Sequence, residues 1–188
     1  MNCVKAAKNI EFIIKRSRFI GQVIPCSNEK EVSQQLKQLH QHHVNASHIA
    51  YAYRIKSQTN TVVRFFDAGE PSGTAGKPIL QHLEGKDLIN TLIAVIRYFG
   101  GIKLGAGGLT RAYSNAAKQA LEGCNIQTYV EFKQLTLQVD YKQLPQLEYH
   151  INKLGGSIEH QDFAQSISVT LSLPITAIPH FTSIFKIN

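Results

Sequence analysis

The sequence predicts an α+β protein of two domains, and three observations support this fold class. Residues 92–121 pass from an apolar strand pattern through five glycines into a helical pattern. Residues 135–185 show a β-α-β-β-α order that can fold as a unit of its own. The 188 residues are 43% hydrophobic and 18% charged, which is typical of a folded, globular chain. We therefore expect domains at residues 1–130 and 131–188.

The elements of the first domain begin with alternating apolar residues. Strand patterns precede the glycines at residues 10–14, 18–25, 47–56 and 61–66. The last two form a hairpin that turns at residues 57–60. Between the two strand pairs a helix starts at Asn28, which can cap it, and Glu31 completes a capping box. Its tail holds three residues that we interpret as surface histidines: His40, His42 and His43.

A polar loop at residues 67–78 follows the hairpin. Its side chains supply donors, acceptors and both charges: Asp67, Glu70, Ser72, Thr74 and Lys77. It is not a P-loop, because Pro71 replaces the first glycine and Pro78 replaces the Ser or Thr after the lysine. Pro78 instead predicts the first residue of a helix over residues 78–83.

A second loop lies between the next strand and the helix that ends at Gly123. It contains five glycines: Gly100, Gly101, Gly105, Gly107 and Gly108. Glycines let backbone N–H groups point into one concave space, and a helix N-terminus adds partial positive charge. Because Arg97, Lys103 and Arg111 surround it, we expect an anion site that takes phosphate. The alternative is tight-turn chemistry with close packing.

Apolar patterns also predict the strands and helices of the second domain. Alternation predicts strands at residues 135–139, 157–163 and 167–173, and Pro174 stops the last one. A helix with apolar residues at helical spacing ends at Gly155, and a short final helix starts near Pro179.

The charge of +7 lies mostly in residues 1–60, where nine Lys and Arg stand against three Asp and Glu. Its densest point is Lys15, Arg16 and Arg18. A basic face suits a phosphate backbone, and the alternative is an ordinary solvated surface. No run is apolar enough to span a membrane, and no signal peptide is visible. Three widely spaced cysteines indicate reduced thiols in a cytoplasmic protein without a metal site.

Three motifs now resemble one family. Residues 97–113 resemble the signature of the IMPACT/YigZ family, residues 69–78 its second hallmark, and residues 46–54 a third. The resemblance covers essentially the whole chain. It implies an N-terminal β-α sandwich like the second domain of a small-subunit ribosomal protein, a fold shared with GHMP kinases. It also implies a ferredoxin-like C-terminal domain similar to domains of elongation factor G.

The same resemblance implies contact with RNA or the ribosome. Eukaryotic members regulate translation initiation by competing for the activator of a stress-response kinase, through an extra N-terminal domain. This chain starts at the IMPACT domain, so we expect the bacterial YigZ form without that partner. The chain departs from the family pattern in two ways. Ala68 replaces one of the two acidic residues before Gly69, so only Asp67 remains, and this loss weakens a metal or general-base role for the loop. The final ferredoxin-like strand is expected to be short or missing.

Two functions therefore compete, with a third as the plainest alternative. The first is a non-enzymatic nucleic-acid or ribosome-associated protein of translation regulation, without cofactor or metal. Its phosphate contacts would be Lys15, Arg16, Arg18, Arg64, Lys77, Arg97, Lys103 and Arg111. Its motif pocket would comprise His48, Tyr53, Asp67, Glu70, Ser72, Thr74, Tyr98 and the five glycines, with Tyr53 or Tyr98 stacking on bases.

The second function is an enzyme acting on a phosphorylated small molecule or nucleotide, with acid–base and phosphate-binding groups from His48, Glu70, Ser72, Thr74 and Lys77. No catalytic residue is assigned. The third is a protein-interaction module whose loops only shape its surface. If the two loops converge, one pocket should join Glu70, Lys77, Arg97 and Arg111.

Overall fold

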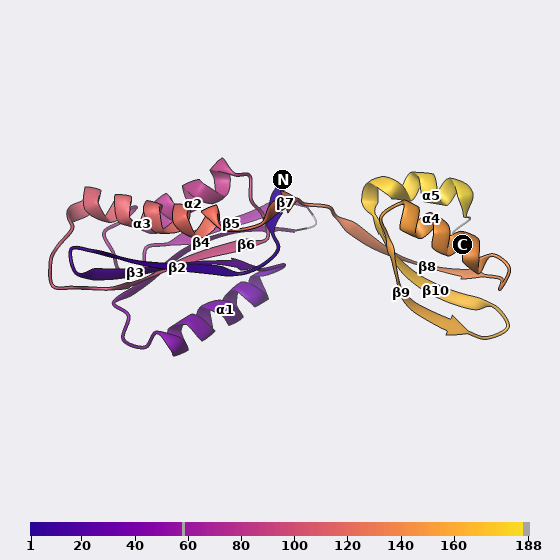
Figure 1. Ribbon diagram of the computed structural model, residues 1–188, viewed down its shortest axis with the longest axis horizontal. Coiled ribbons are helices and arrows are strands. Elements are labelled where there is room, and N and C mark those ends of the chain that lie inside the picture. Colours follow the sequence, from indigo (N-terminus) through magenta and orange to yellow (C-terminus); the bar gives the residue numbers. More distant parts are fainter. Residues whose placement is uncertain (58, 186–188) are drawn as a thin grey trace. The chain divides into compact units, whose positions relative to one another are not determined.

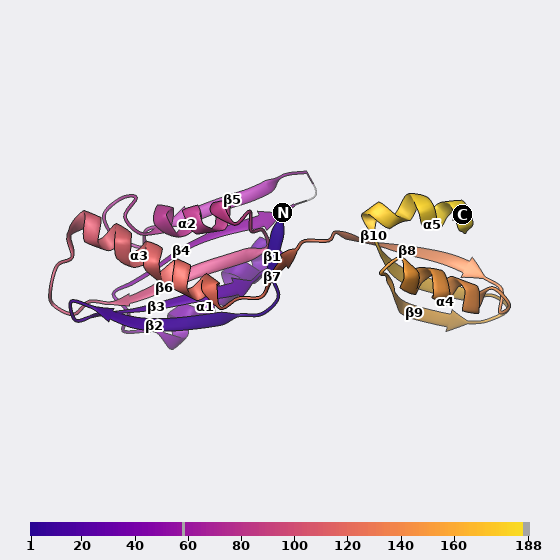
Figure 2. The same cartoon turned by 45° about the horizontal axis from the view of Figure 1, so that its top comes forward.

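The computed structural model describes residues 1–57 and 59–185. The chain divides into two compact units, Met1–Tyr129 and Val130–Asn188 (Figures 1 and 2). Buried apolar clusters lie on both faces of the main sheet in the first unit, and a third cluster fills the second unit. The predicted two-domain α+β architecture is confirmed.

The first unit is built on a five-stranded antiparallel sheet in the order β2-β3-β6-β4-β5. Its strands are β2 (Lys8–Ile14), β3 (Ser17–Pro25), β4 (His48–Lys56), β5 (Thr61–Phe66) and β6 (Thr91–Tyr98). All five were predicted from the apolar strand patterns of the sequence. The turn of the predicted hairpin includes Gln58, which lies outside the described residues.

A small antiparallel pair was not predicted. It joins β1 (Asn2–Val4) to β7 (Ile126–Thr128), which brings the two ends of this unit together. Strands of three residues are too short to show alternation, so the sequence pattern carries no signal for them.

Three helices cover the sheet: α1 (Glu29–His42), α2 (Gly76–Gly85) and α3 (Gly105–Glu122). The two later helices pack on one face and α1 on the other (Figure 1). Successive strand residues point to opposite faces. Ala50 and Ala52 of β4 therefore face α2 and α3, whereas Ile49 and Tyr53 face α1. This alternation decides which predicted residues can share a site.

The helix starts show how local chemistry sets the boundaries. At α1 the Asn28 side chain accepts a hydrogen bond from the Glu31 N–H at 2.9 Å, as predicted. The Glu31 carboxylate reaches one residue further back, to the N–H of Ser27 at 2.7 Å. Helix α2 begins at Gly76, not at the predicted Pro78, because the Asp67 carboxylate accepts from the Gly76 N–H at 2.8 Å.

The second unit has the predicted β-α-β-β-α order. Its elements are β8 (Phe132–Val139), α4 (Leu144–Lys153), β9 (Ser157–Phe163), β10 (Ile167–Pro174), a 3-10 turn (Ile175–Ala177) and α5 (Ile178–Ile184). The strands are antiparallel in the order β8-β10-β9, and both helices contribute to one core with them. A final ferredoxin-like strand would follow α5, where residues 186–188 lie outside the described part. No described helix is both long and apolar enough to cross a membrane.

Candidate functional site

The two predicted loops meet in one cavity of about 430 Å³ in the first unit, here called the Glu70 cavity. The residues lining it are His48, Glu70, Pro71, Arg97, Phe99, Lys103, Leu104, Gly105, Ala106 and Leu109. The expected convergence of the loops is therefore present, and it joins Glu70 to Arg97. Lys77 and Arg111, which the sequence placed in the same pocket, are not among the lining residues.

A buried ion pair forms part of the lining of this cavity. The Arg97 Nη1 atom is 2.6 Å from Glu70 Oε1, and their side chains are only 5% and 4% exposed. The second guanidinium nitrogen of Arg97, Nη2, lies 3.4 Å from Ser17 Oγ. A buried charge is tolerated when it is paired and hydrogen-bonded, and both conditions are met here. Arg97 is thus held inside the protein.

Tyr113 of α3 completes the pair. Its hydroxyl donates to the same Glu70 oxygen at 2.7 Å. Burial, followed by this hydrogen bond to Glu70, raises the pKa of Tyr113 far above its ordinary value, so the hydroxyl stays a donor. In the sequence, Tyr113 stood out only as part of the helical pattern and of the family signature at residues 97–113. A tyrosine within an alanine-rich stripe was the available signal, because a buried hydroxyl needs a partner.

His48 enters the cavity from β4. Its Nδ1 lies 2.9 Å from the carbonyl oxygen of Ala68. A carbonyl only accepts, so Nδ1 carries the hydrogen, and in the neutral ring Nε2 is left as an acceptor. That Nε2 lies 3.8 Å from Glu70 Oε1. Ala68 itself has a left-handed backbone, φ +54°, which is a strained conformation for a residue other than glycine.

Asp67 shapes the first loop from within. Its carboxylate accepts three hydrogen bonds, from the backbone N–H groups of Gly73, Ala75 and Gly76. Burial works to raise the pKa of Asp67, but these three donors outweigh it and hold the pKa below its usual value. Asp67 is a structural residue of the loop, and this role needs no second acidic neighbour.

Of the remaining residues of the polar loop, one is buried and stabilises the loop, and two are exposed to solvent. Thr74 is buried and its hydroxyl donates to the Pro71 carbonyl at 2.7 Å, which tightens the loop. Ser72 and Lys77 are exposed, and neither lines the Glu70 cavity.

The glycines of the second loop have separate tasks. Gly101 and Gly105 adopt φ of +84° and +71°, which favour glycine. A Cβ atom at Gly100 would collide with the backbone of Arg16, so the β2–β3 turn packs directly on this loop. Gly107 and Gly108 lie near the start of α3, where no side chain caps the helix. The first N–H groups of α3 are therefore open to an external acceptor.

A smaller cavity of about 300 Å³ lies beside the first and shares Leu104 with it. Lys15 and Arg111 line it, and Lys103 lines the Glu70 cavity. These three exposed cations are here called the basic rim. Lys15 and Arg16 form the β2–β3 turn with left-handed backbones, φ +44° and +65°.

The other predicted contacts lie elsewhere on the first unit. Tyr53 faces α1, is 8% exposed, and donates to Glu29 at 2.7 Å. Burial and this bond to Glu29 raise the pKa of Tyr53 to about 12. Its ring therefore offers little surface to a base. Arg64 is exposed on the edge strand β5, away from the lining residues of both cavities.

Tyr98 and Arg18 pair with each other on the α1 face. The Arg18 guanidinium lies 4.2 Å from the centre of the Tyr98 ring. The Tyr98 hydroxyl lies 2.8 Å from Nδ1 of His43. His43, predicted to be a surface histidine, is thus half-buried and partnered, because the helix end packs on β6.

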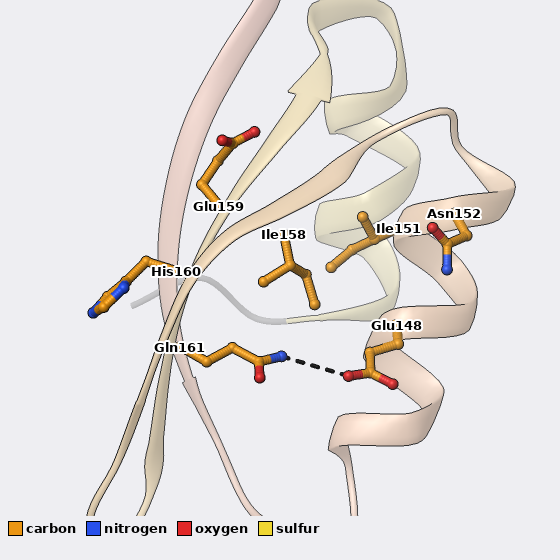
Figure 3. Close-up of a pocket in the computed structure, with 7 residues that line it drawn as sticks. All are labelled: Glu148, Ile151, Asn152, Ile158, Glu159, His160 and Gln161. Carbon is orange, nitrogen blue, oxygen red and sulfur yellow. Dashed lines mark hydrogen bonds between the residues drawn. The ribbon is translucent and has the colours of Figure 1, made fainter.

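A cavity in the second unit has a different character. It measures about 490 Å³ and lies between α4 and β9 (Figure 3). Glu148 and Glu159 line it, Gln161 donates to Glu148 at 3.4 Å, and His160 points away from α4. Two carboxylates disfavour an anion. Within residues 1–57 and 59–185, no group of three His, Cys, Asp or Glu can hold a metal. The Glu70 cavity is therefore the candidate site.

Comparison with known families and relatives bears on both units. Residues 15–121 match the model described as Impact N-terminal domain, and residues 137–183 match a domain of unknown function, DUF1949. An "IMPACT family member" of Haemophilus influenzae is 36% identical over 180 residues, covering 95% of this chain and 87% of the relative. "IMPACT family member YigZ" of Escherichia coli is 32% identical over 171 residues, covering 90% and 84%.

One solved structure resembles nearly the whole chain. The chain superimposes on the crystal structure of a hypothetical protein with a TM-score of 0.70 and 31% identity, over 97% of this chain and 89% of the other. A two-domain translational regulator, Yih1, matches with a TM-score of only 0.39 and 20% identity over 62% of this chain. The second likeness is too distant to bear on fold or function.

Proposed function

The chain belongs to the IMPACT family, with YigZ among its bacterial relatives, and on this premise we propose that it binds RNA phosphates through the basic rim. The RNA would be free or part of the ribosome. The protein would act by binding, in keeping with the translational role that the family resemblance implies for eukaryotic members.

The observation that carries this proposal is the grouping of cations around the start of α3. Lys103 lines the Glu70 cavity together with the first residues of α3, and Lys15 and Arg111 line the neighbouring cavity together with Gly108 of the same uncapped helix. Open N–H groups and nearby cations attract the same anions. An RNA strand presents such anions in a row, so neighbouring phosphates can occupy neighbouring parts of the rim.

An enzyme acting on a phosphorylated small molecule is the second candidate. The proximity of His48 to the buried Glu70, 3.8 Å between Nε2 and Oε1, favours it. The described lining of the Glu70 cavity, however, includes no Ser, Thr or Cys that could serve as a nucleophile beside His48. The described lining therefore does not supply the nucleophile that covalent catalysis would need.

Co-sedimentation with purified ribosomes, and binding to short single-stranded RNA, test the proposal. The variant Lys103→Ala/Arg111→Ala removes two cations of the rim. Its control is Lys37→Ala/Lys118→Ala, which removes the same charge from exposed positions on α1 and on the later part of α3. Arg97→Ala would be a poor probe, because it leaves Glu70 buried and unpaired.

We expect binding by the wild type and the control, and a loss of binding of about tenfold or more in the rim variant. Absence of wild-type binding at low salt would overturn the proposal, and so would equal loss in both variants.

A further inference from the structure

The Glu70 cavity combines three kinds of surface. Its buried part is polar, from Glu70 and Arg97. Leu104 and Leu109 give it apolar walls. Phe99 and Lys103 are exposed lining residues, beside the first turn of α3. A ligand that fits all three must carry a polar edge, a flat apolar face and an anionic group.

Several polar atoms of this cavity have unused hydrogen-bonding capacity. Arg97 Nε is buried and has no hydrogen-bond partner in residues 1–57 and 59–185. Glu70 Oε2 accepts no hydrogen bond from any described residue, since both donors to this carboxylate use Oε1. His48 Nε2 is too far from Glu70 for a hydrogen bond, at 3.8 Å. The buried Arg97 Nε needs a partner, and Glu70 Oε2 and His48 Nε2 have capacity to accept a hydrogen bond from the same ligand.

Phe99 offers the flat surface. The Phe99 residue is 47% exposed. Its backbone is nevertheless fixed, because its N–H donates to Ser47 Oγ at 3.0 Å. The Arg97 guanidinium lies 5.4 Å from the centre of its ring. An aromatic ring held in this way at the wall of a polar cavity is a stacking surface, and every nucleobase has a face that can use it.

From these observations we infer that the Glu70 cavity holds a single nucleotide, with its base against Phe99 and its phosphate at the start of α3 beside Lys103. The inference rests on the proposed function, since an RNA strand would supply the nucleotide as an unstacked base. A volume of about 430 Å³ falls in the usual range for small-molecule sites, about 300–1,000 Å³. The base edge then meets His48, Glu70 and Arg97.

Titration of the full chain with the four nucleoside 5′-monophosphates, followed by NMR chemical shifts, tests this inference. Inorganic phosphate and a nucleoside without phosphate are titrated in parallel. Phe99→Ala removes the stacking ring, and Phe65→Ala is its control, because Phe65 is equally exposed at 48% on β5. Lys103→Ala removes the cation at the phosphate, and Lys77→Ala is its control on the exposed start of α2.

We expect saturable binding of at least one nucleotide that is tighter than binding of phosphate or nucleoside alone. Phe99→Ala should weaken it about 5- to 100-fold, whereas Phe65→Ala should not. Lys103→Ala should weaken it more than Lys77→Ala does. Equal affinity for phosphate and nucleotide would overturn the inference, as would binding unchanged in Phe99→Ala, or no binding at millimolar nucleotide. RNA binding that persists in Phe99→Ala but fails in Lys103→Ala/Arg111→Ala would leave the proposed function standing without the nucleotide pocket.

Discussion

The carboxylate of Glu70 and the guanidinium of Arg97 form an ion pair across 2.6 Å in the interior of the first unit. The two residues are 27 positions apart and come from the polar loop and from β6. Tyr113 of α3 donates to the same carboxylate, so loop, sheet and helix are joined at one oxygen. This network shapes the Glu70 cavity.

Removing one partner of the Glu70–Arg97 ion pair should lower the free energy of unfolding. Glu70→Ala leaves the Arg97 guanidinium buried without its counter-charge, and we expect a loss of about 3–5 kcal/mol in the free energy of unfolding. Glu84→Ala, at an exposed position of α2, should change it by less than about 0.5 kcal/mol. Urea denaturation followed by NMR signals of the first unit measures both. Similar stabilities of the two variants would contradict a structural role for the pair.

The Tyr113 hydroxyl should be worth more than an ordinary hydrogen bond. Tyr113→Phe keeps the ring, which packs edge-on against Phe19 with centroids 5.5 Å apart, and removes only the donor. Because the acceptor is a buried carboxylate, we expect a loss of about 1.5–3 kcal/mol. Tyr129→Phe is the control, at the end of the unit. If Tyr113→Phe unfolds at the same urea concentration as the wild type, the hydroxyl does not support Glu70.

Gly100 should tolerate no side chain. Gly100→Ala places a methyl group against the backbone of Arg16, which cannot move as a flexible side chain can, and we expect a loss of about 2 kcal/mol or more. Gly85→Ala, where a methyl group meets nothing within 4 Å, should be neutral or slightly stabilising. The two midpoints of denaturation are compared directly. A harmless Gly100→Ala would show that the β2–β3 turn does not rest on the glycine loop.

Stability should fall as the pH drops below neutrality. Burial, then the charge of His42 and Arg18, holds the pKa of His43 below its usual 6.5, and burial, then Lys86, does the same for His82. The folded state therefore binds these protons less readily than the unfolded state. Their contribution is intact above pH 6.5 and is lost as the pH falls from there towards the lower folded values.

The double variant His43→Asn/His82→Asn should flatten this dependence, and His180→Asn, at an exposed position, should not. Unfolding free energies between pH 7.5 and 5 provide the comparison. A slope that is unchanged in the double variant would assign the pH dependence to other groups.

The sequence was sufficient for most of the secondary structure, and the reason is local. Apolar strand patterns predicted each strand of the main sheet, and Asn28 marked the start of α1 because its side chain acts on the next turn. The start of α2 was placed two residues late. Its boundary depends on Asp67, which lies nine residues before Gly76 and reaches it only in the folded loop.

The site was predicted in part, for a similar reason. Glu70, Arg97 and the glycines stood out by residue type, and the two loops do converge. Their roles could not be derived, because partners such as Tyr113 are far away along the chain. Tyr53 and Tyr98 were grouped with this pocket, although strand alternation turns both to the α1 face. Assigning the two tyrosines correctly requires knowing which face of the sheet carries His48 and Arg97. The order of the strands in the folded sheet shows this.

The most direct test of phosphate binding by the basic rim is the salt dependence of RNA affinity. The slope of log K against log salt reports how many phosphates the protein neutralises, and each cation removed should lower it by about one. Lys103→Ala/Arg111→Ala should therefore reduce the slope by about two, with Lys37→Ala/Lys118→Ala unchanged. A slope that is the same in wild type and rim variant would place the RNA elsewhere and contradict the proposed function.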